Sequence, residues 1–215
     1  MSNCRQFRSN PGYLLAPLSE QDLAPIWREV RKIEQDFSQG ESVVKYLTGN
    51  IRHEYQLRDC RQHVQTVLQQ YIAEYVNTFD YASRLQQLDT NRPLIIKEDD
   101  LWVNFQGPGE FNPPHHHSGV FSFVIWLQIP YTWDQELAAG PGRDGYEPEN
   151  GQFVMHYTDT LGQIRQERLW IDSGKQGSVC LFPNTMIHHV SPFYSTDQWR
   201  ISVAGNFKFK VAYDS

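Results

Sequence analysis

Five of the eight histidines in this 215-residue chain fall into two short clusters. The first, His115-His116-His117, follows two prolines, and the second, His188-His189, follows an apolar segment and a turn. Successive side chains of an extended segment point to opposite faces, so His115 and His117 share one face. Histidine clusters that are distant in sequence can meet between strands and bind one metal ion. We therefore predict a metal centre, although three adjacent histidines alone would also suit a solvated polar turn.

The second cluster belongs to a longer motif that runs from Phe182-Pro183 to Ser191-Pro192 and is followed by Arg200-Ile201-Ser202. H-x-H, this distal motif and R-x-S occur in an order that resembles the Fe(II)/2-oxoglutarate-dependent dioxygenases. The resemblance is closest to the small prolyl-hydroxylase-like oxygenases of bacteria and their phages, and it covers roughly residues 93–210. It implies an enzyme that uses Fe(II), 2-oxoglutarate and O2 to hydroxylate a substrate, with release of succinate and CO2.

The resemblance also implies roles for individual residues. His115 resembles the first metal ligand and His188 the distal ligand, with His189 facing away. Arg200 resembles the basic residue that binds the far carboxylate of 2-oxoglutarate, and Ser202 resembles the hydroxyl beside it. A guanidinium is a planar and permanently charged group that suits a carboxylate, and a strand would place Arg200 and Ser202 on one side.

The chain departs from the family pattern at one ligand. The usual iron site has two histidines and one carboxylate, whereas this chain has His117 at the carboxylate position. We expect a working iron centre of three histidines, His115, His117 and His188. The alternatives are a carboxylate from elsewhere, such as Glu110, or an altered or lost activity. His116 would be a ligand only if a bulge interrupted the strand.

Hydrophobic periodicity indicates the elements that must position these residues. Apolar residues at helical spacing predict amphipathic helices that begin near Ser19 and near Val64. From residue 93 the chain is rich in short β-segments bounded by turns: PLIIK, LWVNFQ, VFSFVIWLQIPY, QFVMHYT, ERLWID, GSVCLFP and WRISVAGNFKFKV. We predict one domain, 1–215, in which helices of 1–92 support a double-stranded β-helix (jelly-roll) core at 93–215.

Several further features of the sequence have weaker signals. The first dozen residues are polar, and we expect them to be loosely held. The stretch 132–151 has no period and is rich in Gly, Pro and acidic residues, so we expect a long loop that could act as a lid. Asn104 shares a strand face with Trp102, where it could line a pocket or bond to backbone. His53, His63 and His156 have no partner at ligand spacing.

Composition limits the possible partners. A net charge of −6 and a pI near 5.7 give no basic surface for nucleic acid, and no apolar stretch is long enough to cross a bilayer. Three cysteines without a CxxC pair are typical of reduced thiols in a cytoplasmic protein. We expect a small-molecule or peptide substrate, such as a peptidyl proline, whose identity the fold alone does not specify.

Two other classes of protein share this fold. A cupin-type metalloenzyme would explain the histidines, but the glutamate expected after H-x-H is missing and Thr185 stands where a glycine is expected. A cupin would also give Arg200 and Ser202 no role. A non-catalytic jelly-roll module with a structural metal would need no basic residue at the base of its pocket, so Arg200 counts against that class too.

Overall fold

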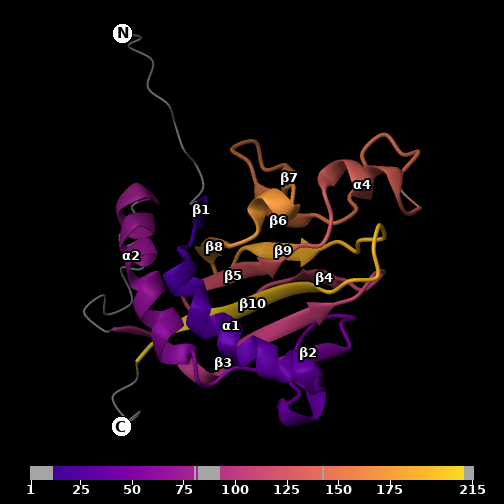
Figure 1. Ribbon diagram of the computed structural model, residues 1–215. Coiled ribbons are helices and arrows are strands. Elements are labelled where there is room, and N and C mark those ends of the chain that lie inside the picture. Colours follow the sequence, from indigo (N-terminus) through magenta and orange to yellow (C-terminus); the bar gives the residue numbers. More distant parts are fainter. Residues whose placement is uncertain (1–11, 80, 82–92, 142, 211–215) are drawn as a thin grey trace.

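Two antiparallel β-sheets face each other, and helices cover the outer face of the larger sheet (Figure 1). The computed structural model describes residues 12–79, 81, 93–141 and 143–210, so the expectation for the first dozen residues falls almost wholly outside the described residues. The six-stranded sheet contains, in spatial order, β1 (Leu14–Pro17), β8 (Ser178–Pro183), β5 (Phe121–Gln128), β10 (Arg200–Phe209), β3 (Leu94–Gln106) and β2 (His53–Gln56). The four-stranded sheet contains β4 (Asn112–His115), β9 (Ile187–Val190), β6 (Phe153–Thr158) and β7 (Ile164–Leu169).

The expected N-terminal helix begins where its capping residues predict. Helix α1 (Glu20–Gln35) has Ser19 as its N-cap, and Ser19 and Asp22 form a reciprocal capping box that satisfies free backbone N–H groups of the first turn. The second expected helix is α2 (Arg61–Phe79). The short helices are α4 (Trp133–Ala138) and the 3-10 turns Phe37–Gln39, Val44–Tyr46 and Ser173–Lys175.

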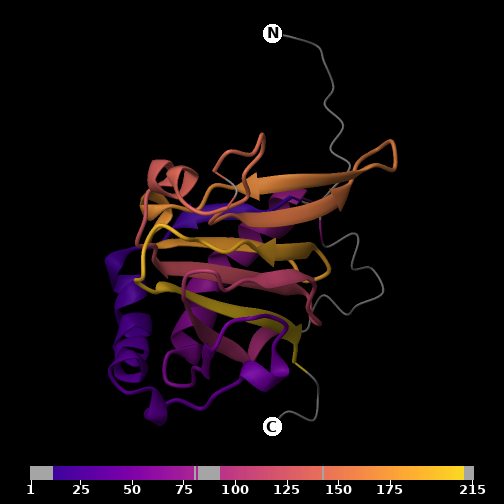
Figure 2. The same ribbon diagram turned by 90° about the vertical axis from the view of Figure 1, so that its right-hand side faces the viewer.

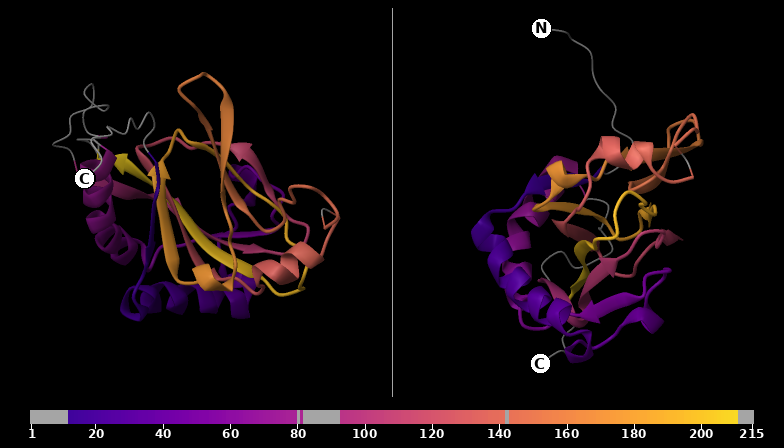
Figure 3. Two further views of the ribbon diagram at one scale, coloured as in Figure 1. Left: turned by 90° about the horizontal axis from the view of Figure 1, so that it is seen from above. Right: turned by 45° about the vertical axis from the view of Figure 1, so that its right-hand side comes forward.

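Both long helices lie against the outer face of the six-stranded sheet, as Figures 1 and 3 show. Ile26 and Val30 of α1 and Leu68 and Ile72 of α2 are buried in one core with alternate residues of the sheet. Because such apolar burial is the dominant favourable term in folding, the helices stabilise the sheet from this side and leave its other face for the site. The mainly β fold with N-terminal helices, a jelly-roll, is therefore confirmed.

Several details differ from the sequence expectations. The segment 1–92 is not wholly helical, because β1 and β2 form the two edges of the six-stranded sheet. PLIIK and LWVNFQ belong to a single strand, β3, and β10 accommodates it with a register shift between Gly205 and Phe207. The expected loop 132–151 begins with the helix α4. The strands β1 and β2 and the helix α4 have four to six residues each, which is too short for hydrophobic periodicity to reveal them. The single-domain organisation stays a prediction.

The two sheets enclose a second core. Val124, Trp126 and Phe182 of the six-stranded sheet pack toward Phe153 and Met155 of β6. Strand β7 forms the outer edge of the four-stranded sheet, and the hairpin β6–β7 extends away from the rest of the molecule (Figure 2). Among the described helices, none is long and apolar enough to span a membrane.

Candidate active site

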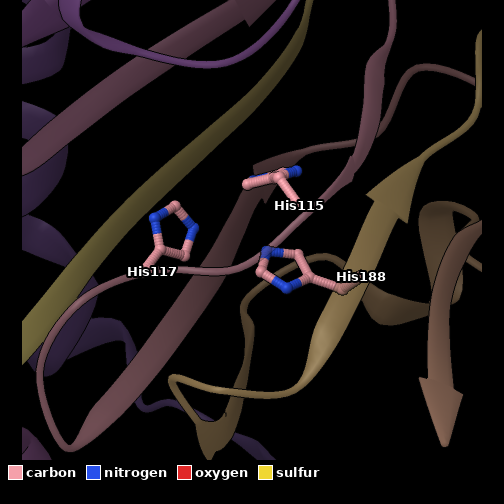
Figure 4. Close-up of side chains that lie close together, drawn as sticks. All are labelled: His115, His117 and His188. Atoms are coloured by element: carbon pink, nitrogen blue, oxygen red, sulfur yellow. The ribbon is translucent and has the colours of Figure 1, made fainter.

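Three histidine side chains converge at one edge of the four-stranded sheet (Figure 4). His115 on β4 lies directly opposite His188 on the neighbouring strand β9, and His117 follows two residues after His115. One ring nitrogen from each of the three lies within 4.8 Å of the other two. The ring centroids are 4.4 to 5.2 Å apart. This spacing suits three imidazoles around a single ion.

Hydrogen bonds select the ring nitrogen that is available in two of these histidines. Nδ1 of His115 lies 2.7 Å from the carbonyl oxygen of Pro113, and Nδ1 of His188 lies 2.9 Å from that of Met186. A carbonyl oxygen only accepts, so in each ring Nδ1 must carry the proton. Nε2 then keeps its lone pair, which is the form that binds a metal ion.

Burial also keeps the three imidazoles neutral. It lowers the pKa of His188 to about 3 and that of His117 to about 4, and it lowers the pKa of His115 as well. The charge that a neighbouring imidazole would carry lowers these pKa values further. All three rings are therefore neutral near pH 7, so a metal ion would not compete with protons there.

Asn184 holds the backbone of His117. Its side-chain amide N–H donates to the backbone carbonyl oxygen of His117 over 2.7 Å, and the backbone carbonyl oxygen of Asn184 accepts from the backbone N–H of His117 over 3.0 Å. This buried residue lies in the turn between β8 and β9, so it links the two segments that carry the clustered histidines. The histidine motifs do not point to Asn184, and the asparagine of the FPNT turn is the signal that could have suggested it.

The neighbouring histidines face away, as strand alternation predicts. His116 is exposed. His189 lies on the opposite side of β9 from His188, where its Nδ1 is 2.8 Å from Nε2 of His156 and its Nε2 is 3.6 Å from Glu149. His156 thus has a partner that its position in the sequence did not suggest.

No carboxylate joins the three histidines among the residues that the structure describes. The carboxylate of Glu110, which the sequence offered as an alternative ligand, accepts from the N–H of Gly107 over 2.9 Å and forms an ion pair with Arg52. These bonds hold Glu110 in the turn after β3, outside the histidine cluster. The arrangement is therefore a set of three neutral imidazoles without a carboxylate.

The structure places Arg200 at the start of β10, with its side chain between the sheets and 3% exposed. Its Nε–H and one Nη2–H donate to the side-chain oxygen of Gln106. The other Nη2–H donates to the carbonyl oxygen of Ser191, and the two Nη1–H groups donate to the hydroxyl of Tyr131 and the carbonyl oxygen of Gly151. All five N–H groups of the guanidinium are thus used within the protein. Neither Gln106 nor Tyr131 is marked as a partner of Arg200 by any motif of the sequence.

The three histidines line one wall of a hollow, which we call the histidine pocket. It holds about 530 Å³ of space between the atoms, including its open mouth, and Ser202 lies in its wall whereas Arg200 does not. Trp102 and Asn104 also line the pocket. Of the two roles considered for Asn104, lining a pocket or bonding to backbone, the structure therefore supports the first. Two polar residues that the sequence analysis did not single out, Glu54 and Asn112, complete its polar wall.

Comparison with known proteins identifies a family for this part of the chain. Residues 100–206, about half of the chain, match the family model of 2OG-Fe(II) oxygenases, where 2OG is 2-oxoglutarate. The matched region contains the three clustered histidines, Arg200 and Ser202. No curated protein matches the chain.

Several solved structures align with most of this chain. AviO1 from Streptomyces viridochromogenes Tue57 aligns over 94% of this chain and 90% of its own length, with 13% identity and a TM-score of 0.52. A prolyl hydroxylase from Trichoplax adhaerens, solved with a hypoxia-inducible-factor peptide fragment, aligns over 93% of this chain and 84% of its own, with 13% identity and a TM-score of 0.51. A prolyl-4-hydroxylase from Pseudomonas putida aligns over 93% and 94%, with 17% identity and a TM-score of 0.47.

Proposed function

Since the chain belongs to the 2OG-Fe(II) oxygenase family, we propose that it hydroxylates a small molecule or a peptidyl residue while 2-oxoglutarate is converted to succinate and CO2. Enzymes of this family use Fe(II), 2-oxoglutarate and O2, and these supply the oxidising chemistry. The residues of the chain bind and orient the reactants and exclude water from the reaction. The family match favours this class over a cupin or a non-catalytic metal-binding module.

The convergence of His115, His117 and His188 carries this proposal. One nitrogen of each ring lies within 4.8 Å of the others, and the rings are neutral. Backbone carbonyls hold the protons of His115 and His188 on Nδ1, so their Nε2 atoms are free to bind the metal. The three rings thus fit the ligand set of a divalent transition metal ion.

Three neutral ligands leave the two positive charges of Fe(II) uncompensated by the protein. The usual site with one carboxylate leaves a single charge. A dianionic cosubstrate would therefore be attracted more strongly here, whereas the metal alone would be held less tightly. We propose that metal and 2-oxoglutarate bind cooperatively in this site.

For the far carboxylate of 2-oxoglutarate we propose Arg200, with Ser202 beside it. Arg200 is buried and has no carboxylate partner within the described residues, so its charge is available for an anion. Its five N–H groups are already bonded, however, so a carboxylate must replace at least one neutral acceptor. The hydroxyl of Tyr131 and the amide of Gln106 are the side chains that can turn away, because the other two acceptors belong to the backbone.

Anaerobic titration of the full-length chain with Fe(II), with and without 2-oxoglutarate, tests the proposal. We expect binding of both, and succinate formation once O2 and a substrate are supplied. His188→Ala should abolish metal binding, whereas the matched variant His189→Ala removes the adjacent outward imidazole and should leave it intact. Absence of both metal binding and 2-oxoglutarate binding in the unmodified protein would contradict the proposal.

The role of Arg200 has a separate test. Arg200→Gln should weaken 2-oxoglutarate binding at least tenfold without changing the affinity for Fe(II) alone, because the metal ligands are elsewhere. If this variant binds 2-oxoglutarate as tightly as the unmodified chain, the proposed role of Arg200 is wrong and another residue binds the far carboxylate of 2-oxoglutarate. The proposed metal site would be unaffected by that result.

A further inference from the structure

One wall of the histidine pocket is a row of polar side chains that crosses three neighbouring strands. Glu54 on β2 lies opposite Asn104 on β3, and Asn104 lies opposite Ser202 on β10. All three line the pocket that also contains the histidine cluster. Tyr55, the next residue on β2, packs into the helix-side core, which agrees with Glu54 pointing to the opposite face.

This wall presents hydrogen-bond acceptors that the protein leaves unpaired. Among the described residues, three pocket atoms are buried without a hydrogen-bond partner: Oε1 of Glu54, Oδ1 of Asn104 and Oδ1 of Asn112. Glu54 is 2% exposed and Asn104 is 6% exposed, so bulk water does not readily replace the missing donors. Native proteins pair nearly all buried polar atoms, so three unpaired acceptors in one pocket indicate a ligand that donates hydrogen bonds.

The orientation of Asn104 supports this assignment. Its amide nitrogen donates to the hydroxyl of Ser202 over 3.3 Å, and its oxygen therefore faces the remaining space. The hydroxyl of Ser122, by contrast, is already used, because it donates to Asn206 over 2.8 Å. The buried atoms of the wall that lack a partner are thus all oxygens.

The electrostatic character of the pocket favours a cation among possible donors. No lysine or arginine occurs among the described residues that line it, so the carboxyl of Glu54 has no basic partner there. Burial, with a further contribution from the carboxylate of Glu110, raises the pKa of Glu54 to about 8. A cation next to Glu54 would favour its ionised form and form a charge-assisted hydrogen bond with it.

We propose that the histidine pocket recognises its substrate through a cationic nitrogen group, an ammonium or a guanidinium, which donates to Glu54, Asn104 and Asn112. Such groups have several N–H donors and no acceptor, so one group can serve more than one of these oxygens. The consequence for reactivity rests on the proposed function, because the cation would fix the position of a neighbouring C–H bond relative to the histidines. In this assignment Glu54 is a substrate-binding residue.

Glu54 also bears on the charge of the assembled site. The three histidines lack the negative charge of the usual carboxylate ligand, and an ionised Glu54 would return one negative charge to the same pocket. With a cationic substrate bound, that charge would be neutralised locally. The pocket can thus accept a cationic substrate near a divalent metal ion. With the three neutral histidines alone, the positive charges of the metal ion and the substrate would repel each other without compensation.

Binding of simple probes to the metal-free, full-length chain tests the inference. We suggest n-butylammonium, n-butylguanidinium and n-butanol, with dissociation constants from NMR shifts of the Trp102 indole, which lies in the pocket. At pH 7 we expect at least one of the two cations to bind at least tenfold more tightly than butanol. Glu54→Gln should reduce this affinity at least tenfold, and Asn112→Ala, in the less buried part of the wall, should reduce it severalfold.

The control variant is Glu74→Gln, which makes the same substitution on the exposed surface of α2 and should bind the probes as the unmodified chain does. Equal binding of butanol and the cations, or cation binding that Glu54→Gln and Asn112→Ala both leave unchanged, would overturn the inference. A blocked tripeptide with one central lysine distinguishes the source of the cation. Tighter binding of this peptide than of n-butylammonium would assign a peptide side chain, and the reverse would assign a small amine.

This experiment is independent of the oxygenase reaction, because it needs neither metal nor 2-oxoglutarate. Cation binding without any binding of Fe(II) and 2-oxoglutarate would contradict the proposed function and leave the cation site standing. Binding of Fe(II) and 2-oxoglutarate without any preference for cations would contradict the cation site and would agree with the proposed function.

Discussion

Replacement of Glu54 by glutamine should make the stability of the protein less sensitive to alkaline pH. The carboxyl group is 2% exposed, and burial raises its pKa from 4.5 to about 8. In the unfolded chain the same group loses its proton near pH 4.5. Between these two pH values the folded state binds more protons than the unfolded state, so unfolding becomes easier as the pH rises.

The size of the effect follows from the two pKa values. The difference between 4.5 and about 8, at about 1.4 kcal/mol for each pKa unit, corresponds to roughly 4 to 5 kcal/mol when the group is fully ionised. Most of this loss, about 4 kcal/mol, falls between pH 5 and pH 9. Glutamine has nearly the same shape and does not titrate, so Glu54→Gln should escape this loss.

Urea unfolding of the chelator-treated protein at pH 5 and pH 9, followed by tryptophan fluorescence, measures the effect. The stability of Glu54→Gln relative to the unmodified chain should rise by about 4 kcal/mol between these pH values. Titration of the histidines occurs in both proteins and cancels in the comparison. Glu74→Gln, on the exposed surface of α2, should show no such change. A difference between Glu54→Gln and the unmodified chain that is the same at both pH values would refute the assignment of Glu54 as a buried neutral acid.

Three further predictions concern the metal centre. His117→Asp should restore the usual carboxylate and tighten Fe(II) binding about tenfold or more in competition with a chelator, whereas His116→Asp, at the outward position, should not. Asn184→Ala should weaken metal binding about tenfold with unchanged circular dichroism, because the backbone of His117 loses the 2.7 Å hydrogen bond from this side chain. In the metal-free protein the ring resonances of His117 and His188 should not titrate between pH 5 and pH 8, since burial lowers their pKa values to about 4 and 3; an NMR midpoint near 6.5 for either ring would contradict this.

The histidine cluster could be predicted from the sequence because its geometry depends on local rules. The alternation of an extended segment predicts His115 and His117 on one side and His116 on the other, although β4 itself ends at His115, and alternation within β9 separates His188 from His189. The helices could be predicted as well, since α1 and α2 are long enough to show a period and Ser19 provides a recognisable cap.

The polar wall of the pocket could not be predicted in this way. Glu54 lies on a four-residue strand whose pairing with β3 depends on contacts between segments about 50 residues apart. Nothing local marks its side chain as buried, because a glutamate in a polar segment is normally exposed. Arg200 illustrates a related limit. Its position in the motif suggested a carboxylate partner, but its bonds to Gln106 and Tyr131 depend on how distant strands meet.

The acceptors that orient two of the clustered histidine rings have a consequence for how this site can change in evolution. His115 and His188 each bond to the carbonyl oxygen of the residue two positions earlier in their own segment, Pro113 and Met186. Every amino acid carries a backbone carbonyl, so no side-chain replacement at these two positions can delete the acceptor. Side-chain mutations at positions 113 and 186 therefore cannot remove the groups that fix these two tautomers. The other residues of the pocket wall can change toward new substrates while His115 and His188 keep the tautomer that could bind a metal ion.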